Sequence, residues 1–390
     1  MRGCPICGSD NLHPLLEAEG VPVFCNVQWA SRDEARAASK ARLDIQLCAD
    51  CGHAHNAAFD GAAVAYSPAY DNSQHFSETF RSYARDLVDR LISAYELRNS
   101  AIVDIGCGRG DLLVMLAERG HNRGYGFDPS FAASSDGPLP GNVTIERSVF
   151  AREHAAELRP SLVCCRHVLE HVSEPVAFLE EIWRAIAPAG FPVLYVEVPN
   201  GEQLLRDQAV WDYIYEHYSY FSKRSLQIAL SAAGFDILRL EEDFGSQFLC
   251  AEARPRERVC GRRDRSVGNW GSADVAGAAA ALQGKLAHWR AWAEEITRDA
   301  HPTTVWGAGS KGVMFLNLLR LSAPSPIDFA IDQNPNKTNR FLAVSGQVVK
   351  APEHLSNVPV EEVVVMNPIY NDEIRSSLSV LGSRARMVTA

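Results

Sequence analysis

The residues most suited to chemistry begin at Asp104, which stands just before three alternating glycines, Gly106, Gly108 and Gly110. An apolar run precedes them and a helical pattern follows, so they form the turn between a strand and a helix. Such a turn lets a ligand lie against bare backbone, and the helix N-terminus adds amide donors and a positive dipole. Asp128 ends the next apolar run, where a carboxylate can accept both hydroxyls of a ribose. We therefore expect a site here for a positively charged sulfonium nucleoside.

Four cysteines near the N-terminus form two pairs with metal-ligand spacing. Cys4 and Cys7 make one C-x2-C pair, and Cys48 and Cys51 make the other. Two thiolates from one tight turn can reach a single ion, and four of them close a tetrahedral zinc site. Because no position on the metal stays open, we predict a structural zinc that stabilises a region too small to fold on apolar burial alone. The alternative is four buried cysteines without a metal.

A second group of reactive side chains follows the apolar run 162–165. Arg166, His167, Glu170 and His171 contain the H-x-x-E-H pattern of a class of zinc peptidases. That pattern belongs inside a long helix, whereas here it follows a buried strand at the carboxyl edge of a sheet, where open α/β folds bind ligands. We therefore predict that Arg166 and His167 lie beside the nucleoside and that His171 contacts the second substrate.

The segment 211–222 is dense in groups that donate, accept or transfer protons, among them Tyr215, Glu216 and His217. A histidine with a pKa near neutrality can accept a proton, a neighbouring carboxylate can orient it, and a tyrosine hydroxyl can stabilise a developing oxyanion. We predict catalytic roles for all three residues. An aromatic lid that only packs over the ligand is the alternative.

The elements that must position these residues follow from the order of apolar runs. Runs and helical patterns alternate from residue 101 to residue 251, which is typical of a sheet of parallel strands with helices on both faces. A helical pattern over 77–95 leads into this doubly wound α/β domain. We predict a zinc-binding domain over 1–60, the doubly wound domain over 61–253, a linker with a basic stretch and an alanine-rich helix over 254–300, and a Rossmann-like α/β domain over 301–390.

The last domain opens with a glycine turn of its own. Gly307, Gly309 and Gly312 follow an apolar run, and Asp332 stands about twenty residues further on, which satisfies the dinucleotide-binding fingerprint. A nicotinamide dinucleotide is therefore one candidate ligand, and an NAD-binding oxidoreductase one candidate function. In the other interpretation the glycines make a tight turn that frames a cleft, where Lys311 faces a phosphate.

The first glycine turn and the Gly-Phe-Asp-Pro sequence around Asp128 closely resemble the two cofactor motifs of the class I methyltransferases, which use S-adenosylmethionine. The resemblance implies that Gly106 and Gly108 border the methionine part of the cofactor. It also implies that Asp104 supports the ammonium group and that Asp128 holds the ribose.

Over nearly its whole length the chain is similar to the sugar C-methyltransferases, which act on nucleotide-linked keto-deoxysugars. The shared features are the four cysteines, the methyltransferase motifs, a Glu-His pair in an aromatic segment and a C-terminal Rossmann-like domain with an Asn-Pro-Ile-Tyr sequence that ends at Tyr370. The resemblance implies that His217 is the general base that takes a proton beside a ketone, and that His171 and Tyr70 belong to the active site. The family has Tyr-x-Glu-His, whereas here Ile214 precedes Tyr215, so O-methylation of a sugar or another small natural product stays open.

Composition argues against nucleic-acid-binding, membrane-spanning and secreted classes of protein. The 390 residues carry a formal charge of −10, and an acidic chain is a poor ligand for nucleic acid, so an RNA methyltransferase with zinc knuckles is only a further alternative. The chain lacks an apolar tract of membrane-spanning length, and its first residues do not form a signal peptide. We expect a cytoplasmic monomer or homodimer with a small-molecule substrate and no membrane partner.

Overall fold

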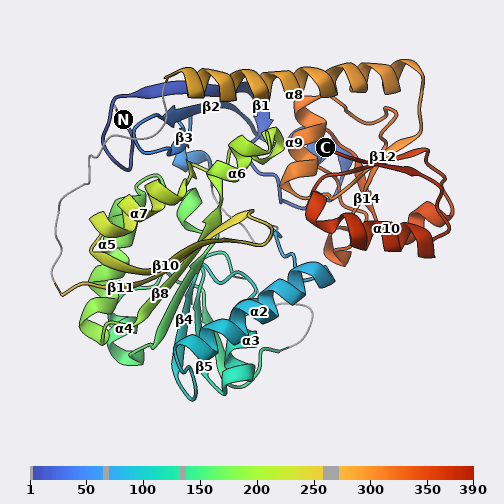
Figure 1. Cartoon of the computed structure of the whole chain (residues 1–390). Helices are drawn as coiled ribbons and strands as arrows, with labels where there is room; N and C mark the ends of the chain where they lie inside the picture. The colour runs from blue at the N-terminus through green and yellow to red at the C-terminus, as the bar shows by residue number, and fades with distance from the viewer. Residues whose placement is uncertain (1–2, 65–69, 132–137, 258–271) are drawn as a thin grey trace.

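The computed structural model describes residues 3–64, 70–131, 138–257 and 272–390. Its central sheet has seven strands in the order β10-β11-β8-β7-β4-β5-β6 (Figure 1). From β8 to β6 every neighbouring pair is parallel, as predicted. The expectation of parallel pairing is wrong at β11, which runs antiparallel to both β8 and β10 because a tight turn rather than a helix connects it to β10. The strands are β4 (Ala101–Ile105), β5 (Arg123–Phe127), β6 (Val143–Glu146), β7 (Leu162–Arg166), β8 (Val193–Pro199), β10 (Phe235–Asp243) and β11 (Phe248–Pro255).

Helices cover both faces of this sheet. On one face α2 and α3 share a core with Ile102 and Leu162, and on the other α5 and α7 pack over Val103 and Val163. The predicted helix over 77–95 is α2, whose N-cap Ser77 accepts a hydrogen bond from the Phe80 amide. The helices are α2 (Glu78–Ala94), α3 (Asp111–Gly120), α4 (Arg152–Leu158), α5 (Pro175–Ile186), α6 (Gly201–Arg206) and α7 (Lys223–Ala232).

The N-terminal region forms a four-stranded sheet in the order β1-β2-β3-β9. Its last strand, β9 (Ser219–Tyr220), comes from the aromatic segment in the middle of the chain and pairs antiparallel with β3. The segment that carries His217 is thereby tied to the cysteine region through the backbone. The remaining elements are β1 (Leu12–Pro22), α1 (Arg32–Arg36), β2 (Lys40–Cys48) and β3 (Ala54–Asn56).

The C-terminal part is a parallel five-stranded sheet in the order β14-β13-β12-β15-β16, as the Rossmann-like prediction requires. The alanine-rich pattern is the long helix α8, which lies across the N-terminal sheet and reaches α9 (Figure 1). Much of the predicted basic stretch and the glycine connector, 258–271, lies outside the described residues. The elements are α8 (Ser272–Arg298), β12 (Thr303–Trp306), α9 (Ser310–Leu318), β13 (Phe329–Ile331), β14 (Val348–Lys350), β15 (Glu362–Val365), α10 (Asn371–Val380) and β16 (Arg386–Thr389).

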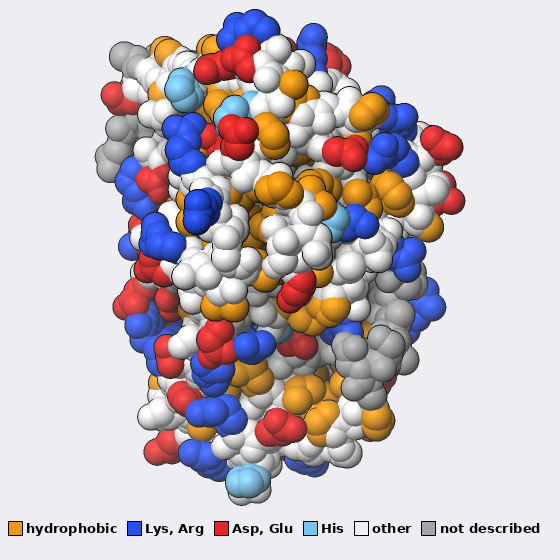
Figure 2. Space-filling view, turned by 90° about the vertical axis from the view of Figure 1, so that its right-hand side faces the viewer, with side chains coloured by type: hydrophobic (Ala, Val, Ile, Leu, Met, Phe, Trp, Pro, Cys, Tyr) orange, Lys and Arg blue, Asp and Glu red, His pale blue; other side chains and the backbone are white. Residues whose placement is uncertain are grey.

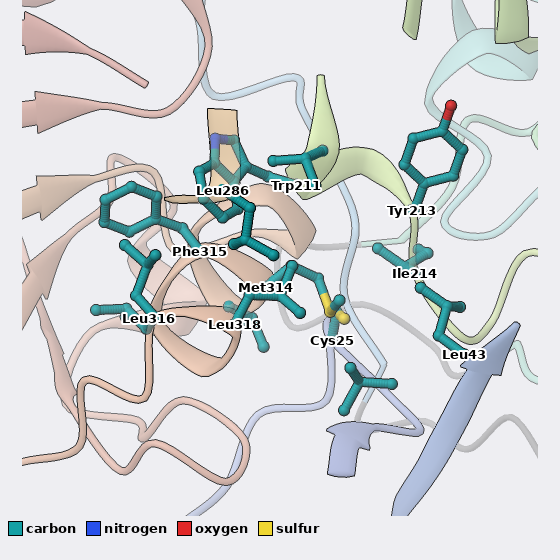
Figure 3. Close-up of a cluster of buried hydrophobic side chains, with 14 of the residues drawn as sticks. Cys25, Leu43, Trp211, Tyr213, Ile214, Leu286, Met314, Phe315, Leu316 and Leu318 are labelled. Atoms are coloured by element: carbon teal, nitrogen blue, oxygen red, sulfur yellow. The ribbon is translucent and has the colours of Figure 1, made fainter. Parts of the chain in front are cut away.

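One apolar core joins the N-terminal sheet, the aromatic segment and the C-terminal part. Figure 3 shows Leu43 of β2, Trp211 of the aromatic segment, Leu286 of α8 and Phe315 of α9 within it. The rings of Trp211 and Phe315 meet edge to face with centroids 4.8 Å apart. The segment that leads to His217 is therefore packed between two parts of the molecule.

The surface mixes both signs of charge. Figure 2 shows Lys and Arg side chains interspersed with Asp and Glu on the face it presents, with no continuous basic area. Within the described ranges, no helix is long and apolar enough to cross a bilayer.

Candidate active site

A cavity of about 1250 Å³ lies between the central sheet and the C-terminal sheet. On one side it is lined by the ends of β4, β5 and β7, and on the other by the turns that follow β12 and β13. Pockets for one small molecule usually measure about 300–1,000 Å³, so this cavity is larger than the usual pocket for one ligand. Both of the glycine turns found in the sequence open into it.

The first glycine turn requires its glycines. Gly106 and Gly108 have positive φ angles of 67° and 53°. A Cβ on Gly106 would lie 2.3 Å from the Val168 side chain, whereas one on Gly108 would meet nothing within 4 Å. The open space over Gly108 faces the cavity, where a ligand can approach the backbone.

Asp128 is already held in position by this turn. One carboxylate oxygen accepts a hydrogen bond from the Gly108 amide at 2.8 Å, and the other accepts from the Ser130 amide at 2.8 Å and the Ser130 hydroxyl at 2.7 Å. These three hydrogen bonds fix the carboxylate at the wall of the cavity. A role for Ser130 was not predicted from the sequence. Its position two residues after Asp128, where an Asx turn is favoured, could have indicated one.

Asp104 is buried beneath the turn and lines the same cavity. Burial raises its pKa to about 7, with Asp128 and Glu197 adding to the effect and Arg166 opposing it. A cationic ligand beside this carboxyl would favour the ionised form. The site is thus suited to a positively charged molecule.

Arg166 and His167 belong to a buried network centred on Glu197 of β8. Arg166 binds the Glu197 carboxylate at 2.7 Å, and the hydroxyls of Tyr83 and Tyr195 donate to its other oxygen at 2.6 and 2.7 Å. Burial by itself would raise the pKa of Glu197, but Arg166 and His167 hold it below the ordinary value. The network fixes the floor of the cavity at the end of β7.

His167 lies between two carboxylates. Its Nδ1 is 3.3 Å from Glu170 and its Nε2 is 3.0 Å from Glu197. Burial acts to lower its pKa, yet the two carboxylates raise it to about 9, so the ring is an imidazolium at neutral pH. This residue cannot accept a further proton and is no candidate for a general base.

The structure brings His171 and His217 together although they are far apart in sequence. Their rings meet edge to face with centroids 4.8 Å apart, and both line the cavity. Burial lowers the pKa of His171, so its ring is neutral and Nδ1 carries the proton that is donated to the Glu216 carbonyl at 2.9 Å. Burial and His171 lower the pKa of His217 to about 3, so its ring is neutral at neutral pH.

Three other predicted residues have different placements. Tyr70 lines the cavity and accepts a hydrogen bond from the Asn26 amide group at 3.4 Å. Tyr215 and Glu216 are not among the described residues that line it. The Tyr215 hydroxyl instead accepts a hydrogen bond from the Asp60 amide at 2.8 Å. Burial raises the pKa of Glu216 to about 8, and the Cys25 backbone opposes this effect.

The four cysteines predicted to bind zinc converge. The sulfurs of Cys4 and Cys51 are 3.6 Å apart, as are those of Cys7 and Cys48, and all four lie within 4.8 Å of one another. Sulfurs around a tetrahedral zinc, each about 2.3 Å from the metal, are separated by about 3.8 Å. The arrangement therefore fits a four-thiolate zinc site.

The C-terminal glycine turn repeats the geometry of the first one. The Gly106 amide donates a hydrogen bond to the Phe127 carbonyl, and the Gly307 amide donates one to the Ile331 carbonyl, both at 2.8 Å. Asp332 accepts from the Ala308 amide at 2.9 Å, just as Asp128 accepts from Gly108. Lys337 forms an ion pair with Asp332 at 3.4 Å, and the predicted phosphate ligand Lys311 instead forms an ion pair with Asp212 at 2.5 Å.

Several cavity residues were not predicted because they come from loops without a chemical motif. Asn26 and Gln28 reach the cavity from the N-terminal region, and Lys337 and Arg340 reach it from the loop after β13. The only signal in the sequence was that Lys337 and Arg340 follow the acid of the second fingerprint.

Comparison with known proteins identifies two parts of the chain. Residues 75–240 match a family model described as a methyltransferase domain, and residues 279–390 match one described as a C-methyltransferase C-terminal domain. The chain is 23% identical over 381 residues to the C-methyltransferase NovU of Streptomyces niveus, an alignment that covers 90% of this chain and 86% of NovU.

Two further similar proteins align with a smaller share of this chain. The ubiquinone biosynthesis O-methyltransferase of Paraburkholderia xenovorans is 31% identical over 100 residues, which are 24% of this chain and 43% of that enzyme. Magnesium protoporphyrin IX methyltransferase from Synechocystis aligns in structure with 45% of this chain and 84% of its own, at 19% identity and a TM-score of 0.34. With both family matches in place, the chain is an S-adenosylmethionine-dependent methyltransferase that carries the C-terminal domain of the C-methyltransferases.

Proposed function

We propose that the enzyme methylates a nucleotide-linked keto-deoxysugar at a carbon next to the ketone, with His217 as the general base. The observation that carries this proposal is a buried, neutral imidazole that lines the same cavity as the cofactor turn. The similarity to NovU over 90% of the chain supports transfer to carbon.

In this reaction His217 accepts the proton from the carbon beside the ketone, which leaves an enolate on the sugar. Bound S-adenosylmethionine supplies a methyl group on a positively charged sulfur, an electrophile that suits such a carbanion. Asp104 and Asp128 hold the cofactor by its ammonium group and its ribose. His171 also lines the cavity, and the Glu216 carbonyl fixes its ring through Nδ1.

The nucleotide part of the substrate is assigned to the C-terminal side of the cavity. That side offers a second glycine turn with the geometry of a nucleoside site, and the cations of Lys337 and Arg340 lie on its lining. The volume of about 1250 Å³, larger than the usual pocket for one ligand, supports binding of the cofactor and a nucleotide sugar together. An NAD-binding oxidoreductase is the competing interpretation, and it requires a change in NADH fluorescence when the protein is added. We expect none.

We also propose that Cys4, Cys7, Cys48 and Cys51 bind a structural zinc. Four thiolates leave no coordination position for a substrate, and the cluster is separate from the residues that line the cavity. Its role would be to stabilise the sheet that receives β9.

Deuterium exchange tests the proposal directly. The purified enzyme is incubated in deuterium oxide with a nucleotide-linked keto-deoxysugar and S-adenosylhomocysteine, so that methyl transfer cannot follow. We expect deuterium at the carbon beside the ketone with wild type and none with His217→Asn. If the enzyme methylates the same sugar in a separate reaction with S-adenosylmethionine but shows no exchange here, it is instead an O-methyltransferase.

A further inference from the structure

The aromatic segment suggests that Glu216 assists its neighbour His217, but the fold supplies a different carboxylate. Glu170 lies in the short 3-10 helix η2 (Leu169–His171), is 1% exposed and lines the cavity. A carboxylate oxygen of Glu170 and ring nitrogens of His171 and His217 all lie within 4.8 Å of one another.

Two atoms in this group lack hydrogen-bond partners within the described residues. Glu170 Oε2 and His217 Nδ1 are both buried and unsatisfied, although polar atoms removed from water are normally paired. The other Glu170 oxygen is engaged by His167 at 3.3 Å. Glu170 thus has one oxygen committed to the structural network and one oxygen available beside the two neutral histidines.

Glu216 is also buried, but it differs from Glu170 in its placement. Its carboxyl group is fully buried, interacts with Cys25 of the N-terminal region and is not on the described cavity lining. Only its main-chain carbonyl reaches the site, where it fixes His171. The carboxyl group is also neutral at neutral pH, because burial raises its pKa to about 8.

We infer that Glu170, and not Glu216, is the positioning residue that stabilises the imidazolium formed when His217 takes the substrate proton. This inference rests on the proposed role of His217 as the base. A carboxylate within about 4–6 Å of a histidine favours its charged form. The buried network of Arg166, Glu197 and His167 keeps Glu170 ionised and fixed in place.

The other charged groups around His217 support this assignment. His171 and the His167 imidazolium both disfavour a second positive charge, and Glu170 is the neighbour that favours it. The positive charge of His167 is itself balanced by Glu197 at 3.0 Å. The Tyr220 ring lies 5.8 Å from the His217 ring, and its hydroxyl is occupied by the Ile214 backbone.

The test compares Glu170→Gln with the matched variant Glu216→Gln in the deuterium-exchange assay. We expect the exchange rate of Glu170→Gln to fall roughly 10- to 100-fold with KM for the sugar unchanged, and Glu170→Asp to recover part of it. The acid limb of its pH profile should move to lower pH, because a base without the carboxylate loses its proton more readily. Glu216→Gln should keep the wild-type pH profile.

Other outcomes would overturn the inference. If wild type exchanges deuterium and Glu170→Gln does so at the same rate, Glu170 has no such role, whereas absence of exchange in wild type would refute the proposed function itself. Binding of S-adenosylhomocysteine, measured by calorimetry, checks that each variant is folded. A bound metal present in wild type and missing from Glu170→Gln would make Glu170, His171 and His217 a metal site instead, so metal content is measured in both.

Discussion

His217 and Tyr215 are two residues apart, yet the turn between η4 (Val210–Asp212) and β9 directs their side chains to different environments. His217 lines the cavity, and Tyr215 stacks on Phe59 with ring centroids 5.8 Å apart. The tyrosine hydroxyl holds the Asp60 amide rather than a substrate oxygen. The shift of this tyrosine by one position relative to the sugar C-methyltransferase pattern therefore coincides with a structural contact.

The first prediction distinguishes the catalytic role proposed for His217 from the structural role of Tyr215. His217→Asn should reduce kcat for methyl transfer by roughly 10²- to 10⁴-fold, because the proposed base is removed, while affinity for S-adenosylmethionine is retained. Tyr215→Phe should leave kcat within a few-fold and lower the free energy of unfolding by about 1 kcal/mol, because the hydroxyl loses its partly buried hydrogen bonds with the Asp60 amide and the Ala58 carbonyl. Steady-state kinetics and urea denaturation measure both. Equal loss of kcat in the two variants would contradict the placement.

The second prediction concerns Asp104. Its pKa is raised to about 7, so the carboxylate that a cationic cofactor needs forms as pH rises through that value. Affinity for S-adenosylmethionine should therefore increase across this range, and Asp104→Asn should bind roughly tenfold more weakly with a flatter pH dependence. Because the folded chain holds this proton more tightly than the unfolded chain, the ligand-free protein should lose stability as pH rises from about 4, the ordinary pKa of an aspartate, to about 7. Calorimetry and thermal melts at several pH values test both trends.

At the scale of single elements, the N-terminus of α2 is capped from another part of the chain. Glu373 of α10 accepts hydrogen bonds from the hydroxyls of Ser77 and Thr79, both at 2.7 Å, and from the Glu78 and Thr79 amides. A negative charge at this end also complements the helix dipole. Since Ser77 borders the cavity, this contact links the C-terminal part to the wall of the site.

The third prediction follows from this cap. Glu373→Gln should lower the free energy of unfolding by about 1 kcal/mol, the usual value of a helix cap. Its neighbour Asp372, whose side chain is 98% exposed, provides the control, and Asp372→Asn should change stability little. The contacts with Ser77 and Thr79 hold the pKa of Glu373 below its ordinary value, so the cap should weaken as pH falls toward that pKa. Urea denaturation at two pH values measures the effect.

At the scale of the whole molecule, the cysteine region and the active site are mechanically connected. The Ser222 hydroxyl donates a hydrogen bond to the Cys51 carbonyl at 2.9 Å. Next to this contact, strand β9 pairs with strand β3. His217 lies two residues before β9, so its position depends on the N-terminal sheet that β9 joins. The four cysteines lie in or next to the strands of this same sheet. The proposed zinc would therefore affect catalysis without contacting the substrate.

The fourth prediction is that removal of zinc impairs both stability and activity. Wild type should contain one equivalent of zinc, and Cys48→Ser should lose it together with several degrees of melting temperature. Methyl transfer should fall in this variant more than affinity for S-adenosylmethionine, because the cofactor turn belongs to a different sheet. Elemental analysis, thermal melts and calorimetry distinguish these effects, and full activity of a zinc-free protein would contradict the link.

The sequence alone determined the features that depend on neighbouring residues. Strand, glycine turn and helix around Gly106 are encoded within about twenty residues, and the C-x2-C pairs bring their own turn geometry, with Gly8 and Gly52 at positive φ. The helix of 77–95 and the α/β alternation were likewise visible as periodicity. These signals are local, and the described structure contains each of them.

Only the tertiary structure decided which distant groups meet. The recruitment of β9 into the N-terminal sheet, the cap from Glu373 and the pairing of His171 with His217 join segments that no local pattern relates. Sequence proximity suggested Glu216 as the carboxylate beside His217, whereas the parallel sheet brings the end of β7, with Glu170, to that position. The physical reason is that a side chain's direction is set by the backbone turn it stands on, while its neighbours are set by the order of strands in the sheet.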